Sequence, residues 1–300
     1  MKDVIIQGML ADGGMRFSAI SGRQMVTDAK NTHGLSLTAT AALGRQLLMT
    51  AMLAAQLKNE ADTVSTVLSG GGAGGNLVSV GRFGGLVKGY CANPGAELPP
   101  LPTGKLNVGG FVGKDGKLTV IRDLGLKDPY VGTCRLVSGE IAEDYAQYFT
   151  VSEQQPSLVY LGVRIDTASG QVLSAGGVLL QTMPGCPDEV IDKAIALAPF
   201  VEDFALRLQD GETPEGILRS IFGRMGCTFT NETEPAYRCD CSRERMETAL
   251  IAVGRDELAD ILKTDKQAEL VCHFCNKKYR FSEENLAQLL ASLDNTEDEE

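Results

Sequence analysis

Apolar residues in the first 184 positions occur in short runs that glycine residues interrupt. The runs are rich in Val, Leu and Thr and are bounded by turn residues, which is typical of β-strands. One of them contains Asp115-Gly116, which predicts a hairpin at 113–118 because this pair suits a tight turn with positive φ. Strands are predicted within TVSTVLSGGG (63–72), NLVSVGRFGGLVKGYC (76–91), KLNVGGFVGKDGKLTVIRD (105–123), SLVYLGVRI (157–165) and QVLSAGGVLLQ (171–181).

Two helices are predicted among these strands. The most apolar long segment is LSLTATAALGRQLLMTAMLAAQLK (35–58), but Arg45, Gln46 and Gln56 interrupt it. It therefore fits a buried core helix better than a membrane span. SGEIAEDYAQYF (138–149) predicts the second helix. Helices and strands do not alternate regularly, which favours an α+β fold with a β-rich amino-terminal domain and packed helices.

The pattern changes after MPGCPDE, where apolar residues begin to recur at helical spacing. Over 187–223 this predicts two short amphipathic helices. Thr213 is placed to cap the second one, with Pro214 at its first position and Gly223 at its end. We expect these helices to pack against their own domains, and an apolar face that binds a partner is the alternative.

A small, compact region follows. Ser242 is placed to cap one helix, Asp256 to start another and Ser282 to cap the last. AELVC (268–272) and KKYRF (277–281) predict a hairpin that carries a cysteine pair between its strands. A domain of this size is marginal on its own, and a bound metal would supply the stability that its core lacks.

The chain therefore divides into four parts. We expect a core domain at 1–184, a helical linker at 185–232, a zinc-binding domain at 233–293 and an acidic tail at 294–300. The tail, DNTEDEE, is expected to be disordered because its like charges repel one another.

Composition and charge narrow the function. The chain has 300 residues, 43% hydrophobic and 22% charged, which is ordinary for a soluble globular protein. A net charge of −11 argues against nucleic-acid binding, since that affinity comes mainly from Lys and Arg. The amino terminus, MKDVIIQGML, lacks the pattern of a secretory signal. We expect a cytoplasmic protein without membrane contact, whose eight cysteines are free, metal-bound or regulatory rather than joined in structural disulfides.

Two close cysteine pairs predict a metal site. Cys239 and Cys241 form a Cys-x-Cys pair, and Cys272 and Cys275 form a Cys-x-x-Cys pair, with thirty residues between the two pairs. Zinc prefers tetrahedral thiolate ligation, and two such pairs brought together by folding meet that requirement. The prediction is one Zn²⁺ per chain in a closed, non-catalytic site, with His273 inside the second pair as a weaker candidate ligand.

The single residue between the first two cysteines is unusual, because structural zinc sites generally place about two to four residues there. Zinc also holds each sulfur as a thiolate, the form that oxidants attack, so the site can be a structural zinc site, a redox sensor or both. Chemistry alone favours a permanently zinc-stabilised module. The remaining cysteines are expected to be buried small side chains: Cys91, Cys134, Cys186 and Cys227.

Enzyme classes find little support in the sequence. The glycine-rich SGGGAGGNLVS (69–79) lacks the Gly-Lys-Ser/Thr ending of a phosphate-binding loop and is expected to connect strands. CHFC lies between strand patterns, whereas a catalytic dithiol generally lies at a helix N-terminus. His33 and His273 are the only histidines, so few residues could activate a nucleophile as a general base. No enzymatic activity is expected.

The segments around the cysteines resemble a known family. YRCDCSRERMETALIAVGRDELADIL (237–262) and AELVCHFCNKKYRFSEENLAQLL (268–290) are similar to the carboxy-terminal redox-switch module of the bacterial thirty-three-kilodalton heat-shock protein family. RDLGLKDPYVGTCRLVSGEIAEDYAQYFTVSEQQPSLVYLGV (122–163) and AGGVLLQTMPG (175–185) resemble that family's amino-terminal domain. The resemblance covers nearly the whole chain in the right order.

This resemblance implies a redox-regulated, ATP-independent holdase chaperone. In the reduced form the four cysteines would hold Zn²⁺ and the chaperone would be inactive. Peroxide with unfolding stress, or hypochlorous acid, would form Cys239–Cys241 and Cys272–Cys275 disulfides and release zinc. The switch domain and linker would lose structure, and the uncovered apolar surface would hold unfolding client proteins, often in a homodimer. The alternative is a constitutive zinc-stabilised protein-interaction module without redox switching.

Overall fold

The computed structural model describes residues 2–297. The chain divides into two compact units, Met1–Arg238 and Cys239–Glu300. Both contain helices and strands, which confirms the expected α+β class. Within the described residues, no helix combines the length and apolar character needed to cross a membrane.

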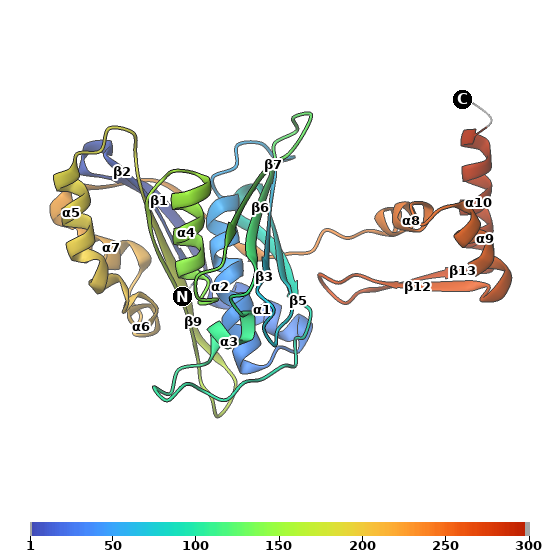
Figure 1. Ribbon diagram of the computed structural model, residues 1–300, viewed down its shortest axis with the longest axis horizontal. Helices are drawn as coiled ribbons and strands as arrows, with labels where there is room; N and C mark the ends of the chain where they lie inside the picture. The colour runs from blue at the N-terminus through green and yellow to red at the C-terminus, as the bar shows by residue number, and fades with distance from the viewer. Residues whose placement is uncertain (1, 298–300) are drawn as a thin grey trace. The chain divides into compact units, whose positions relative to one another are not determined.

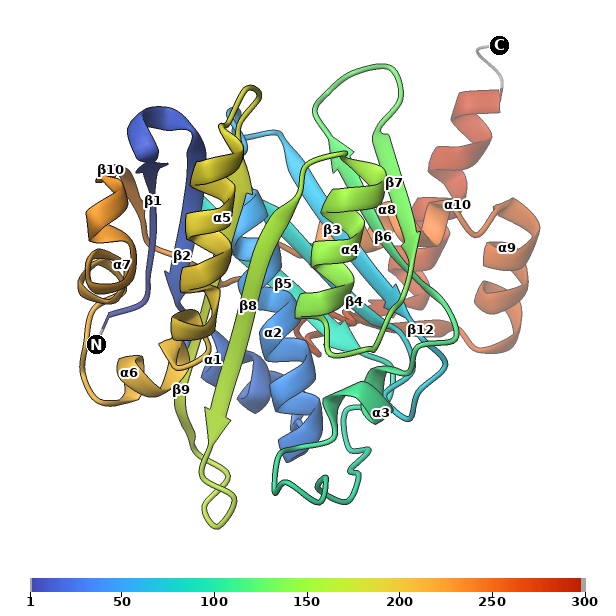
Figure 2. The same ribbon diagram turned by 60° about the vertical axis from the view of Figure 1, so that its left-hand side comes forward.

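The first unit contains a five-stranded antiparallel sheet with strand order β10-β1-β2-β9-β8 (Figures 1 and 2). Two of its strands, β8 and β9, form where the apolar runs at 157–165 and 171–181 predict them. The 3-10 helix η1 (Ala11–Gly13) connects the first two strands. The strands are β1 (Val4–Leu10), β2 (Met15–Ser21), β8 (Ser157–Ile165), β9 (Val172–Thr182) and β10 (Cys227–Thr233).

A six-stranded sheet forms the other side of this unit, with strand order β11-β5-β4-β3-β6-β7. Neighbouring strands are antiparallel except for β11, which pairs in parallel with β5. The 3-10 helix η2 (Phe83–Gly85) joins β4 to β5. The strands are β3 (Thr63–Ser69), β4 (Leu77–Arg82), β5 (Leu86–Cys91), β6 (Lys117–Asp123), β7 (Tyr130–Arg135) and β11 (Ala236–Tyr237).

Helix α2 (Leu37–Ala54) lies between the two sheets and packs on both, as Figure 2 shows. It is the predicted buried core helix. Gln46 Nε2 donates to Thr66 O at 3.0 Å, which gives the buried amide nitrogen a hydrogen-bond partner. Three further helices precede the linker: α1 (Arg23–His33), α3 (Val108–Val112) and α4 (Ala142–Ser152). The last of them forms in the predicted second helical segment.

The linker segment covers the opposite face of the five-stranded sheet. It forms three helices rather than the predicted two, together with 3-10 turns η3 (Ala198–Val201) and η4 (Gly223–Met225). The helices are α5 (Asp188–Leu197), α6 (Phe204–Gln209) and α7 (Pro214–Phe222). Thr213 Oγ1 accepts a hydrogen bond from Gly216 N at 3.1 Å, which confirms the predicted cap of α7.

These three helices bury an apolar layer against the sheet. Phe204, Ile217 and Phe222 pack in one cluster with sheet residues that include Phe17 and Val178. Packing of the linker within its own unit is therefore confirmed. Strand β10, which no apolar run predicts, follows α7 and pairs with β1.

The second unit contains the predicted hairpin, β12 (Gln267–Val271) and β13 (Lys278–Ser282), in an antiparallel pair. Ser242 Oγ accepts from Arg245 N at 3.3 Å and Ser282 Oγ accepts from Asn285 N at 3.4 Å, so both predicted caps form. The helices are α8 (Arg243–Ile251), α9 (Arg255–Thr264) and α10 (Glu283–Glu297).

Two local predictions are wrong. The segment 113–118 is not a hairpin, because it leads from α3 into β6 and the positive φ belongs to Gly113 rather than to Gly116. Helix α10 continues to Glu297, so disorder is wrong for 294–297. Its first turn carries Glu283 and Glu284, which the positive end of the helix dipole favours. Residues 298–300 lie outside the described residues.

Candidate metal centre

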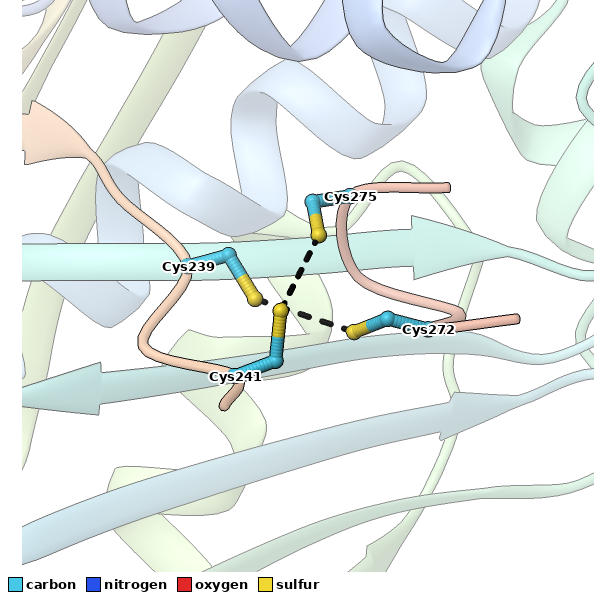
Figure 3. A group of neighbouring side chains, drawn as sticks. All are labelled: Cys239, Cys241, Cys272 and Cys275. Carbon is cyan, nitrogen blue, oxygen red and sulfur yellow. Dashed lines mark hydrogen bonds between the residues drawn. The ribbon is translucent and has the colours of Figure 1, made fainter. Parts of the chain in front are cut away.

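The four cysteines of the predicted zinc site lie together in the second unit (Figure 3). Their Sγ atoms all lie within 4.8 Å of one another. Cys239 Sγ is 3.7 Å from Cys272 Sγ, and Cys241 Sγ is 3.4 Å from Cys275 Sγ. An ion about 2.3 Å from each sulfur of a tetrahedron requires sulfur–sulfur distances of about 3.8 Å. The four thiols therefore fit a tetrahedral metal ion.

The turn of the β12–β13 hairpin positions the second pair. Cys272 N donates to Lys277 O at 2.9 Å, which closes the hairpin directly after β12. Cys275 N and Asn276 N donate to Cys272 O at 3.3 and 2.8 Å. Asn276 has a φ of 58°, a left-handed conformation that asparagine adopts more readily than most residues. Main-chain bonds thus fold the turn so that its two sulfurs face the first pair (Figure 3).

The start of helix α8 positions the first pair. Ser242, which caps the helix, directly follows Cys241. Between the two cysteines, Asp240 Oδ2 accepts a hydrogen bond from Arg245 Nη1 at 2.6 Å. These contacts fix the short Cys-x-Cys segment to the first turn of α8, so that both sulfurs point to the same centre.

A tyrosine supports the site from the hairpin. Tyr279 Oη donates a hydrogen bond to Cys241 Sγ at 3.1 Å. Strand alternation in β13 places Tyr279 and Phe281 on the buried face, and the sequence predicts this pattern. The sequence does not predict the contact between Tyr279 and the sulfur of Cys241, because that contact depends on how the hairpin packs against the first cysteine pair.

Burial and hydrogen bonding separate the pKa values of the thiols. Burial raises the pKa of Cys239 and that of Cys275 above the usual range. Burial opposes ionisation of Cys241 as well, but hydrogen bonds from Tyr279 and the neighbouring thiols outweigh it and lower its pKa to about 7. Cys241 therefore ionises before Cys239 and Cys275, and its thiolate is the form that binds metals and reacts with oxidants.

The other cysteines lie outside this group. Cys91 and Cys134 are buried as predicted, and burial raises the pKa of each to about 11, which keeps them protonated at neutral pH. Cys186 and Cys227 are half-buried instead, at the border of the cluster under α5–α7. All eight cysteines are free thiols.

The two histidines and the glycine-rich run, the remaining candidates from the sequence, lie outside the four-sulfur group. His33 Nε2 lies 2.8 Å from Tyr237 Oη, and the exposed His273 is not part of the four-sulfur group. The glycine-rich run connects β3 to β4, as predicted. A Cβ at Gly70 would lie 2.3 Å from Gly113 O, so the run needs glycine for close backbone packing.

Comparisons with known proteins agree over both units. A family model described as Hsp33 protein matches residues 3–282, a range that includes all four clustered cysteines. A 33 kDa chaperonin from Caldanaerobacter subterraneus subsp. tengcongensis is 44% identical over 299 residues, covering 98% of this chain and 100% of the relative. One from Clostridioides difficile is 41% identical over 293 residues, with the same coverage. The crystal structure of a 33 kDa chaperonin from Thermotoga maritima gives a TM-score of 0.87 at 36% identity, covering 98% of this chain and 100% of that one.

Proposed function

The chain belongs to the Hsp33 protein family, and from this premise we propose that it is a redox-regulated, ATP-independent holdase for proteins that unfold under oxidative stress. Family membership supports a chaperone function, and a chaperone binds client proteins. The observation that carries the regulatory part is the group of four cysteine sulfurs within 4.8 Å of one another. Four protein thiolates close a tetrahedral site and leave no position for a substrate, which suits a switch better than catalysis.

The reduced form would hold one Zn²⁺ through Cys239, Cys241, Cys272 and Cys275. Zinc suits this donor set because it is a borderline-soft ion that prefers tetrahedral sulfur ligation, and when bound it keeps every ligand as a thiolate. The hydrogen bond from Tyr279 to Cys241 supports this assignment, since ligating atoms are commonly oriented by partners outside the metal's own shell.

Oxidation would convert the four thiolates into two disulfides. Two molecules of hydrogen peroxide would accept the four electrons that the sulfurs lose and would become four hydroxide ions, and the resulting disulfide sulfurs would be too poor as ligands to hold Zn²⁺. Family resemblance supports the pairing Cys239–Cys241 and Cys272–Cys275. In the reduced arrangement the nearest sulfur contacts instead join Cys239 to Cys272 and Cys241 to Cys275.

Loss of zinc would unfold the domain at 233–293, whose small core includes Cys272 itself. We further propose that the linker at 185–232 then leaves the five-stranded sheet. The apolar side chains beneath α5–α7, which include Phe17 and Val178, would be uncovered and hold client segments. The active form would be a homodimer in the cytoplasm, and re-reduction would restore the zinc site.

A constitutive zinc-stabilised interaction module is the second candidate. It shares the four-sulfur site and differs in requiring no oxidation for partner binding. Its support is that the site is closed and packed among apolar residues, as structural zinc sites are.

One experiment separates the two functions. Zinc release and suppression of client aggregation are measured together, before and after peroxide treatment at elevated temperature. The holdase proposal expects both to rise together and to reverse on reduction. A Cys186→Ser variant, which keeps the four clustered cysteines, is the matched control and should respond as the wild type does. Zinc retention with activity independent of oxidation would contradict the switch and favour the constitutive module.

A further inference from the structure

Strand β10 covers the edge of β1 in the five-stranded sheet (Figure 2). On one side, β1 pairs with β2 over its whole length, from Val4 to Leu10. On the other side, β10 pairs with it in antiparallel register, from Ile5 opposite Thr233 to Leu10 opposite Cys227. Departure of β10 would leave a row of unpaired N–H and C=O groups along β1.

The side chains of β10 make few contacts with β1: Asn231 Nδ2 donates to Gln7 Oε1 at 3.1 Å and Thr230 Oγ1 donates to Gln7 O at 3.3 Å. Its sequence, CTFTNET, contains Asn and Glu, which are unfavourable in strands, and four of its seven residues are exposed. The main apolar contact is made by Phe229, whose ring centroid lies 5.3 Å from that of Phe17. Main-chain pairing therefore holds most of the strand, and any extended polypeptide can supply the same bonds.

Strand β1, by contrast, is fixed in the core and would stay in place. Ile5 and Leu10 are buried on opposite sides of the sheet, one in each of the unit's two apolar clusters. Gly8 allows the backbone of β10 to approach β1 closely, because a Cβ at position 8 would lie 2.1 Å from Thr228 O. Glycine in a strand is typical of a site where a second backbone approaches closely.

We propose that the edge of β1, once β10 has left it, binds an extended segment of the unfolding client as an added strand. The inference rests on the proposed holdase function and names where the client binds. Most of β10 belongs to the linker at 185–232, so the activating step would also open this edge. Unfolded chains are the occupants that fit, because their main-chain groups are unpaired, whereas those of folded proteins are already bonded.

A peptide that copies β10 tests the proposal in the oxidised full-length chain. The peptide spans 226–234 and carries Cys227→Ser, which prevents disulfide exchange. A control peptide also carries Asn231→Pro and Glu232→Pro. Neighbouring residues of a strand direct their N–H groups to opposite sides, so one of the two prolines must remove a donor that faces β1. Binding of a fluorescently labelled unfolded client is then titrated with and without each peptide.

We expect the β10 peptide to bind and to compete with the client. At about ten times its own Kd it should raise the apparent Kd of the client about tenfold, whereas the proline peptide should have no effect. Unchanged client affinity at saturating peptide, or no binding of the peptide, would overturn the inference and leave the holdase function standing. An oxidised chain that binds the peptide but no client would overturn both. If the peptide dissociates a dimer of the chain without changing the affinity for the client, a second copy of the chain occupies the edge of β1. This result would also overturn the inference.

Discussion

Tyr279 connects the hairpin to the sulfur cluster through a single hydrogen bond, 3.1 Å from its Oη to Cys241 Sγ. Its ring is buried, and Lys277 Nζ lies 5.0 Å from the ring centroid, so both burial and a cation–π contact hold the ring in place. A donor aimed at one sulfur stabilises the thiolate form of that sulfur, which is the form that binds a metal.

Replacing this tyrosine should therefore weaken the metal site without unfolding it. Tyr279→Phe keeps the buried ring and removes only the hydroxyl. We expect metal affinity to fall by about tenfold, in the range of 10- to 100-fold typical of groups that support ligands from outside. A competition titration with a chromogenic zinc chelator under reducing conditions measures this. Unchanged affinity would show that the hydroxyl does not support the site.

Loss of a ligand should cost more than loss of its support. Cys272→Ser removes one of four sulfurs, so we expect metal affinity to fall by more than about 100-fold, beyond the effect of an outer-shell residue. Metal content per chain and far-UV circular dichroism of the reduced protein measure the loss of ion and structure. Cys186→Ser, a half-buried cysteine outside the cluster, should leave both unchanged. Wild-type metal content in Cys272→Ser would contradict the four-thiolate assignment.

At the scale of elements, helix α7 is the part of the linker with the clearest local signals. Thr213 caps it, Pro214 begins it, and Ile217 and Phe222 bury its apolar face under the five-stranded sheet. The proposed activation requires this helix to leave the sheet. Its cap should therefore set part of the free energy of that opening.

Removal of the cap should make α7 open more readily. Thr213→Ala leaves Gly216 N without its acceptor and costs about 1 kcal/mol, which corresponds to about fivefold faster hydrogen exchange of α7 amides in the reduced chain. Thr213→Ser retains a hydroxyl and should exchange as the wild type does. Equal exchange in all three proteins would show that the cap does not govern opening of the linker.

Elements that carry their own signals were predictable from the sequence, and elements defined by distant partners were not. Apolar content predicts α2, and caps with apolar spacing predict α7 and α10. Strand β10 has one large apolar residue, Phe229, and becomes a strand because β1, from the opposite end of the chain, pairs with it. The candidate metal centre follows the same rule, since cysteine spacing predicts its four sulfurs but not the contact made by Tyr279.

At the scale of the whole molecule, the two units depend on different forces. The first unit buries large side chains such as Tyr145, Phe149 and Phe111 between its sheets. Among its described residues, the second has a small core of six buried side chains: Leu250, Leu258, Cys272, Tyr279, Phe281 and Leu286. Two of the six, Cys272 and Tyr279, belong to or contact the sulfur cluster. We therefore expect the second unit to depend on a bound metal ion for its stability, and the first unit not to.

Metal removal under reducing conditions should therefore unfold the second unit while the six-stranded sheet of the first unit stays folded. Binding of an ion to the folded state adds to its stability, and a strong chelator withdraws that contribution. Hydrogen exchange followed by mass spectrometry should show loss of protection in β12 and β13, while β3 and β4 keep theirs. The same chelator saturated with zinc is the control and should change neither. Protection retained in β12 and β13 would contradict dependence on the metal, and simultaneous loss in β3 and β4 would contradict the independence of the two units.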